Sequence, residues 1–148
     1  YSSEDVHRAL EGMRGLGERF LIEEMASAPL AELIVGITRD PVCGLTMTLG
    51  AGGVLTELLD DTASLLLPVQ ETEIRNALSQ LKIGQLLDGY RRSDAADIDA
   101  LVANIICIAK YAVSHADSLE ELDVNPLFAT QFGSIAVDAL IVKRMTDD

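Results

Sequence analysis

Three oxygen-bearing side chains interrupt two apolar runs near the C-terminal end of the sequence. Asp123 and Asn125 lie in "LEELDVNPL", and Asp138 lies in "SIAVDAL". Alternate side chains of a strand share a face, so Asp123 and Asn125 point the same way if the first run is extended. We expect both runs to be strands joined by a four-residue loop over 130–133. That register places Asn125 directly opposite Asp138, with Asp123 as a diagonal neighbour.

One amide oxygen and two carboxylates at one spot suit a hard divalent cation such as Mg²⁺. This ion takes oxygen ligands, commonly one or two carboxylates, and completes its octahedron with waters and substrate phosphates. The alternative is a group of polar side chains that face solvent, with the Asn-Pro step serving as a turn. The spacing alone leaves both interpretations open.

Composition limits the class of protein. The chain has 148 residues, 49% of them hydrophobic, which suffices for one packed domain or two small lobes. The net charge of −13 argues against non-specific binding to nucleic acid or to anionic membranes. No long uncharged apolar run predicts a membrane span, and no signal peptide is visible. Cys43 and Cys107 lie in apolar runs, so we expect buried, reduced thiols in a cytoplasmic protein.

Hydrophobic periodicity predicts helices and strands in the order helix, strands, helices, strands. Helices are expected within 2–15, 70–84 and 95–116, with a short helical piece within 84–94 and a cap for the long helix at Ser93 or Asp94. Strands are expected within 19–25, 31–40, 42–50, 58–69, 119–129 and 134–142. This order predicts an α+β fold with a largely antiparallel sheet and helices packed on one face.

Five segments, taken in order, resemble the ATP-grasp module of ADP-forming (NDP-forming) acyl-CoA synthetases of the acetate–CoA ligase type, with succinyl-CoA synthetase β subunits as more distant relatives. They are "FLIEEM…AELIVGITRDPVCG", "LGAGGVLTELLDD", "LLDGYR", "ELDVNPL" and "AVDAL". The ordered set is specific, although no single piece is. The resemblance implies that 20–148 is the C-terminal lobe, the second subdomain of an ATP-grasp fold. Residues 1–19 would then be a short helix from the tail of the first lobe.

The resemblance implies roles for the polar residues of the closing hairpin. In this family the Mg²⁺ ligands are the Asn of a D/E-x-N-P motif and an acidic residue on the following strand. These positions correspond to Asn125 and Asp138. Asp123 matches the acidic residue of the motif and would line the phosphate site. The resemblance and the expected register therefore select the same pair by separate routes.

A nucleotide site is also implied by the resemblance. "IEEM" matches the strand that links the two lobes, whose backbone hydrogen-bonds the adenine edge near Glu23, Glu24 and Met25. Glu32 matches the position that binds the ribose hydroxyls, which a carboxylate accepts well. The alternatives are a solvated strand end with a core methionine and, at Glu32, an ordinary exposed strand residue.

A glycine-rich loop, "LGAGGVLTELL", forms the other candidate ligand site. Glycines let the backbone approach a ligand and present N–H donors to an anion. The resemblance implies a phosphate loop near which a phosphohistidine segment of another domain docks. Its candidate members are Gly50, Gly52, Gly53, Glu57 and Arg39. The alternatives are a tight turn without ligand contact and, for Arg39, a surface ion pair.

The resemblance implies that the parent protein is an acid–CoA ligase (ADP-forming), which converts acid, CoA and ATP to acyl-CoA, ADP and phosphate. Mg²⁺ would be its cofactor, ATP/ADP its nucleotide, and CoA and a carboxylic acid its other substrates. CoA-binding and phosphohistidine domains would lie on the same or a partner chain, and this lobe alone should be inactive. The alternatives are a degenerate synthetase-like regulatory module of a protein acetyltransferase and an unrelated acidic interaction module. The acid, the choice of ATP or GTP, and the oligomeric state do not follow from the sequence.

Overall fold

A single antiparallel sheet organises the computed structural model, which describes residues 2–53, 61–91 and 94–144. Its neighbours run in the order β3-β2-β1-β4-β5, and β6 also pairs with β4. The strands are β1 (Ala31–Asp40), β2 (Gly44–Ala51), β3 (Thr62–Leu66), β4 (Leu119–Thr130), β5 (Gly133–Ala136) and β6 (Ala139–Lys143). The largely antiparallel sheet predicted from the sequence is confirmed.

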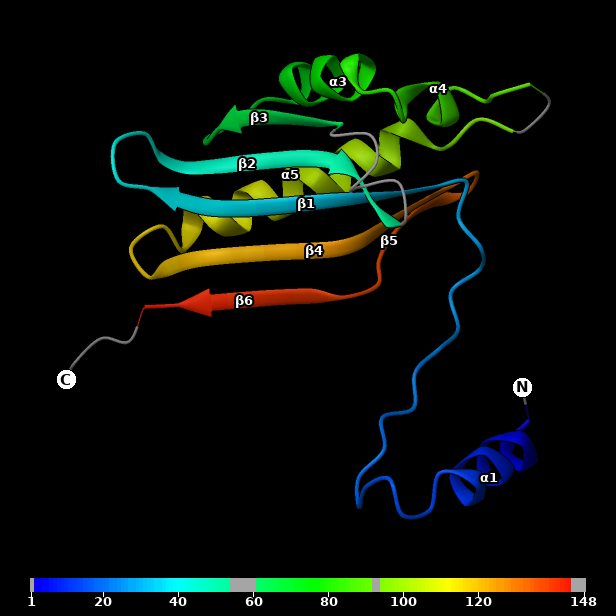
Figure 1. The fold of residues 1–148 in the computed structure, drawn as a ribbon. Coiled ribbons are helices and arrows are strands. Elements are labelled where there is room, and N and C mark those ends of the chain that lie inside the picture. Colours follow the sequence, from blue (N-terminus) through cyan, green and yellow to red (C-terminus); the bar gives the residue numbers. More distant parts are fainter. Residues whose placement is uncertain (1, 54–60, 92–93, 145–148) are drawn as a thin grey trace.

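Three helices cover one face of this sheet. They are α3 (Glu71–Gln80), α4 (Gly84–Leu87) and α5 (Ile98–Ser114). Figure 1 shows α5 passing behind the strands and α3 above β3, whereas the face toward the viewer carries no helix from the described part of the chain. None of the described helices is both long and apolar enough to cross a bilayer. The α+β class with helices on one face is therefore confirmed.

Alternation along the central strand β1 separates the two faces of the sheet. Leu33, Val35 and Ile37 have no exposed surface and pack toward the helices. Glu32 and Gly36 fall on the alternate positions of β1, keep partial exposure, and belong to the open face. The facing helix α5 buries a stripe at helical spacing: Leu101, Val102, Ile105, Ala109 and Ala112. Burying each Leu-sized side chain contributes roughly 1.5–3 kcal/mol, so this interface holds the layers together.

The long helix α5 begins later than the sequence predicted. Its cap is Asp97, whose side chain accepts the N–H of Ala100 at 3.0 Å. The N–H of Asp97 donates to Thr130 O at 2.9 Å, which ties the preceding segment to β4 and keeps it out of the helix. Asp94 is therefore not the cap, and Ser93 lies outside the described residues.

Both cysteines are exposed, which contradicts the expectation of buried thiols. Cys107 lies on α5 away from the stripe that faces the sheet. Cys43 lies in the turn between β1 and β2, where its N–H donates to Asp40 Oδ1 at 2.7 Å. Apolar neighbours in sequence did not imply burial, because helical periodicity turns Cys107 away from the sheet and Cys43 lies in a turn rather than in a strand.

The N-terminal part of the chain lies apart from the sheet. Helix α1 (Ser3–Gly12) is closed by a capping box between Ser2 and Asp5, and none of its residues is buried. Figure 1 shows it at the end of a long extended segment that leaves the sheet before β1. This segment contains no strand, so the predicted strand over 19–25 is wrong. A strand needs a neighbour to satisfy its N–H and C=O groups, and no described strand pairs with this run.

Candidate functional site

From Glu121 to Thr130, strand β4 pairs with β6 and β5 in one register. Leu127 of β4 faces Ala136 of β5, and further along β4 Val124 faces Ala139 of β6. Between these pairs the N–H of Asn125 donates to Asp138 O at 3.2 Å. Asn125 therefore lies opposite Asp138, as the sequence predicted.

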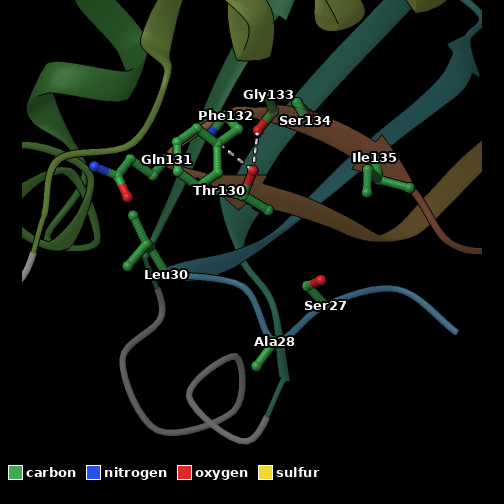
Figure 2. A pocket seen from close by; sticks show the side chains of 9 residues that line it. All are labelled: Ser27, Ala28, Leu30, Thr130, Gln131, Phe132, Gly133, Ser134 and Ile135. Atoms are coloured by element: carbon green, nitrogen blue, oxygen red, sulfur yellow. Dashed lines mark hydrogen bonds between the residues drawn. The ribbon is translucent and has the colours of Figure 1, made fainter.

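The turn between β4 and β5 is tighter than expected. Thr130 and Gly133 form the last pair of the ladder, so the turn consists of Gln131 and Phe132 rather than a four-residue loop. The hydroxyl of Thr130 donates to Gly133 O at 2.9 Å and accepts the N–H of Phe132 at 3.2 Å (Figure 2). The loop is shorter by one residue at each end, which adds one pair to the ladder and leaves the register unchanged, so the predicted Asn125–Asp138 pairing is found.

Asp123 lies within an uncompensated negative cluster. Partial burial raises the pKa of its carboxyl group, and the negative charges of Glu121 and Asp138 raise it further. Asp138 is thus close enough to act on Asp123 electrostatically. In the described part of the chain no ion pair neutralises any of these three carboxylates. A cation placed there would relieve the repulsion.

The donor set fits part of a magnesium site. Asn125 offers an amide oxygen and Asp138 and Asp123 offer carboxylates, which are the ligand types that Mg²⁺ prefers. Asp138 Oδ1 accepts the N–H of Ala139 at 2.8 Å, which holds that carboxylate in place. Across 2–53, 61–91 and 94–144, no three His, Cys, Asp or Glu side chains converge into a self-sufficient metal site. The remaining ligands would have to be water or phosphate oxygens.

Glu121 was not among the predicted site residues. It lies two positions before Asp123 in β4, and the two carboxylates interact electrostatically. Strand alternation applied to "ELDVN" would have placed both on one face, so the signal was present in the sequence.

Glu32 lies together with two of the predicted loop glycines. The N–H of Gly52 donates to Glu32 O at 2.7 Å. The Glu32 carboxylate lies beside Gly53, on the side where a side chain would begin. These residues share a hollow of about 320 Å³. Its lining is completed by Pro29, Leu30, Ala31, Ile83 and Leu86. The structure thus brings the predicted ribose and phosphate-loop positions together, while Glu57 lies outside the described residues.

Close packing against neighbouring backbone explains why residues 50 and 52 of the glycine-rich loop are glycines. A Cβ on Gly50 would lie 3.0 Å from Asp61 O, and one on Gly52 would lie 3.1 Å from the backbone of Glu32. Gly53 has a φ of 66°, and a Cβ there would lie 2.7 Å from Glu32 Oε2. The glycines are therefore needed by the fold itself, which agrees with the tight-turn alternative. Ligand contact at this loop stays a prediction.

Arg39 lies at the other end of β1 from the glycine-rich loop. Its guanidinium donates to the carbonyl oxygen of Leu119 at 2.9 and 3.2 Å and also to that of Ala116. Its Nε lies 3.7 Å from Glu120 Oε1. Gly50 pairs with Ile34, five residues before Arg39 in β1, which is about 17 Å away at the rise of a strand. The structure does not bring Arg39 to the predicted phosphate loop; the side chain fastens the α5–β4 connection, as in the ion-pair alternative.

The predicted adenine segment is exposed. Met25 is 75% exposed, so the core-packing alternative is wrong. Glu23 and Met25 line a hollow of about 470 Å³ with residues of α1, and this hollow shares no residue with the one at Glu32. The structure therefore does not unite Glu23, Glu24 and Met25 with the other candidate residues.

Asp61 is a buried carboxylate that sequence reasoning missed. It is 6% exposed and accepts the N–H groups of Lys82 at 2.8 Å and Ile83 at 2.9 Å. These bonds fasten the α3–α4 connection beside the start of β3. Nothing in "LLDDTAS" distinguishes this aspartate from its neighbour, because its partners lie about 20 residues later and are backbone groups.

Another hollow lies outside the predicted site. It measures about 520 Å³ and lies between the segment before β1 and the β4–β5 turn (Figure 2). Its lining comes from Ser27, Ala28, Leu30, Thr130, Gln131, Phe132, Gly133, Ser134 and Ile135. None of the predicted metal or nucleotide residues is among them, so size alone does not locate the candidate chemistry.

Comparison with known proteins defines the class. A family model described as an ATP-grasp domain matches residues 4–142. The chain therefore belongs to the ATP-grasp domain family. The β subunit of acetate–CoA ligase (ADP-forming) II from Pyrococcus furiosus is 32% identical over 145 residues, which cover 95% of this chain and 61% of that protein. The 4-hydroxybutyrate–CoA ligase (ADP-forming) of Nitrosopumilus maritimus is 34% identical over 115 residues, or 76% of this chain and 16% of that protein.

A solved structure agrees with both relatives. Acetyl-coenzyme A synthetase 1 of Ca. Korarchaeum cryptofilum, in complex with coenzyme A and Mg-AMPPCP, superposes with a TM-score of 0.87 at 32% identity. The match covers 97% of this chain and 65% of that one. The resemblance to ADP-forming acyl-CoA synthetases is confirmed, and this chain spans less than two thirds of the length of these relatives.

Proposed function

We propose that this chain is the nucleotide- and Mg²⁺-binding lobe of an ADP-forming acyl-CoA synthetase. The observation that carries the proposal is the register that sets Asn125 opposite Asp138, with Asp123 close enough for its pKa to respond to the Asp138 charge. These residues offer too few oxygen ligands to complete the coordination of Mg²⁺, and they lie at the open face of the sheet. A site whose remaining ligands are nucleotide phosphates has this arrangement.

Each candidate residue has a defined task under this proposal. Asn125 and Asp138 would hold the cation, and Asp123 would face the phosphates through it. Glu32 would accept the ribose hydroxyls at the hollow it shares with the loop glycines. When bound, Mg²⁺ would neutralise phosphate charge during phosphoryl transfer. The lobe itself would position the cation and the nucleotide. In the described part of the chain no basic side chain forms an ion pair with Asp123, so neutralising charge would have to come from the bound Mg²⁺.

The parent reaction would join a carboxylic acid to CoA with conversion of ATP to ADP and phosphate. The relatives named above act on acetate and 4-hydroxybutyrate, so their names support the class of acid and not one member of it. The solved relative contains coenzyme A and a phosphohistidine segment pointing towards its nucleotide-binding site. We infer corresponding CoA-binding and phosphohistidine partners for this chain. An enzyme that consumes ATP and CoA would work in the cytoplasm.

The domain division follows the same proposal. Residues 20–148 would form the C-terminal lobe and 1–19 the tail of the first lobe. Leu21 is 82% and Ile22 62% exposed, an apolar surface that the remainder of the parent protein would cover. Glu23, Glu24 and Met25 would meet the adenine only in that complete arrangement.

Calorimetric titration of Mg·ADP into the full-length parent protein tests the site. We expect the Asn125→Ala, Asp138→Ala double variant to bind at least about tenfold more weakly, since even outer-shell partners of a metal change its affinity by that factor. The matched control is Asp117→Ala, which also removes one negative charge at an exposed position outside the cluster. Wild-type affinity in the double variant would refute the metal assignment. None of the relatives described above is a regulatory module, so that alternative has no support from them.

A further inference from the structure

Gly36 occupies an unusual place in the sheet. It lies in the middle of β1 on the open face, opposite Thr48 of β2 and opposite Asp123 of β4. Strand interiors disfavour glycine because it has no side chain to pack and loses the most backbone freedom on folding. A glycine there commonly marks a bulge, a close approach of another backbone, or a close approach of a ligand.

The first two explanations fail for Gly36. The register shift between β1 and β4 lies between Leu33 and Val35, and Gly36 itself pairs regularly on both sides. A Cβ at Gly36 would meet, within 4 Å, only the side-chain oxygen Oδ1 of Asp123, at 3.7 Å, which is an ordinary contact. Its φ is also outside the left-handed region, so an L side chain fits the backbone.

Gly50 and Gly52 show what a structurally required glycine looks like in this sheet. A Cβ at either position would approach neighbouring backbone atoms to about 3.0–3.1 Å. Gly36 has no such neighbour, although it lies on the same open face as Gly50. The space above it therefore belongs to solvent or to something that binds there.

We propose that Gly36 is a clearance position: the missing side chain lets the phosphates of a metal-bound nucleotide lie against β1 beside Asp123. The inference rests on the proposed function and deepens it, since it names a residue that admits the ligand without touching the metal. A larger residue at this position would keep the fold and exclude the nucleotide.

The test compares Gly36→Val with wild type in the full-length parent protein. Valine favours strands, so we expect an unchanged or higher melting temperature together with an affinity for Mg·ADP that is lower by about tenfold or more. The matched control is Ser64→Val, which adds a branched side chain to the same face on β3, opposite Thr48. We expect Ser64→Val to keep both its melting temperature and its affinity. A simple loss of folding would lower the melting temperature, which separates a structural effect from exclusion.

The outcomes separate this inference from the proposal beneath it. If Gly36→Val folds and binds Mg·ADP like wild type, the clearance role is wrong. Weak binding by the Asn125→Ala, Asp138→Ala variant would in that case still support the metal site. If Gly36→Val does not fold, Gly36→Ala decides, because its Cβ has only the 3.7 Å contact. A folded Gly36→Ala with wild-type affinity overturns the role, and weaker binding supports it. Wild-type affinity in the double variant defeats the proposed function instead.

Discussion

Two apolar runs of the same chain adopt different structures. "AELIVGITRD" forms β1, with β2 on one side and β4 on the other. "RFLIEEM" forms no strand, and its Ile22 is 62% exposed where Ile37 of β1 is fully buried. Both runs carry the composition of a strand. A strand forms where its backbone N–H and C=O groups have hydrogen-bond partners and its side chains pack against a second layer. An apolar sequence by itself provides neither condition.

Limited proteolysis should show the largest contrast between the two regions. Arg14 and Arg19 lie in the unpaired segment before β1, whereas Lys110 lies within α5. Cleavage inside α5 requires the body to open, at a cost of about 5 kcal/mol or more for an ordinary domain. In the 148-residue chain by itself, without the rest of the parent protein, we therefore expect trypsin to cut after Arg14 and Arg19 at least about a thousandfold faster than after Lys110. Mass spectrometry of timed digests measures the ratio, and comparable rates would show that the N-terminal run is ordered.

Truncating one isoleucine in each run measures the same contrast as stability. Ile37→Ala empties a fully buried site and should lower the free energy of unfolding by about 2–5 kcal/mol. In the same 148-residue chain, Ile22→Ala removes an exposed side chain and should change the free energy of unfolding by no more than about 0.5 kcal/mol. Urea unfolding of both variants provides the two values. Equal losses would mean that Ile22 is buried in solution.

Asp61 provides the next smaller effect, within the paired region. Asp61→Ala leaves the N–H groups of Lys82 and Ile83 without their buried acceptor and should cost about 1–3 kcal/mol. Asp88→Ala, at an exposed position after α4, is the control and should stay within about 0.5 kcal/mol. Urea unfolding again gives the comparison. A neutral Asp61→Ala would show that water replaces the carboxylate.

Asp123 should show the smallest effect, and one that depends on pH. Its folded-state pKa is raised above 3.8, so the ionised carboxylate is disfavoured in the fold, and stability falls as pH rises through the folded pKa. Asp123→Asn removes this penalty. Without metal it should be more stable than wild type at neutral pH by about a few tenths of a kcal/mol, given the partial exposure.

The difference between Asp123→Asn and wild type should vanish as pH falls below 3.8, because the carboxyl is then protonated in both folded and unfolded chains. Urea unfolding at both pH values, in the presence of a chelator, measures it. A variant that is less stable than wild type at neutral pH would contradict the assigned cause. Asp117→Asn, at an exposed position outside the cluster, is the charge-matched control.

The candidate site was predictable where one local rule fixed it. Strand alternation and a short hairpin were enough to pair Asn125 with Asp138. The predicted loop was too long by one residue on each strand, and an error that is equal on both strands does not change the register. The grouping of Glu32 with Gly52 and Gly53 also agrees with the expected nucleotide site. Arg39 failed that expectation because its position along β1 decides which end of the sheet it reaches. No local pattern contains that information.

The sequence by itself determined the α+β class, the order of the helices and strands within the sheet body, the family and the pairing of the metal candidates. These follow from periodicity and from short ordered motifs, which act over one turn or one hairpin. Only the tertiary structure decided that 19–25 is not a strand, that both cysteines are exposed, that Asp61 is buried on backbone partners and that Gly36 has open space above it. Each of these depends on what lies beside a residue in space, and contacts between distant segments leave no periodic trace along the chain.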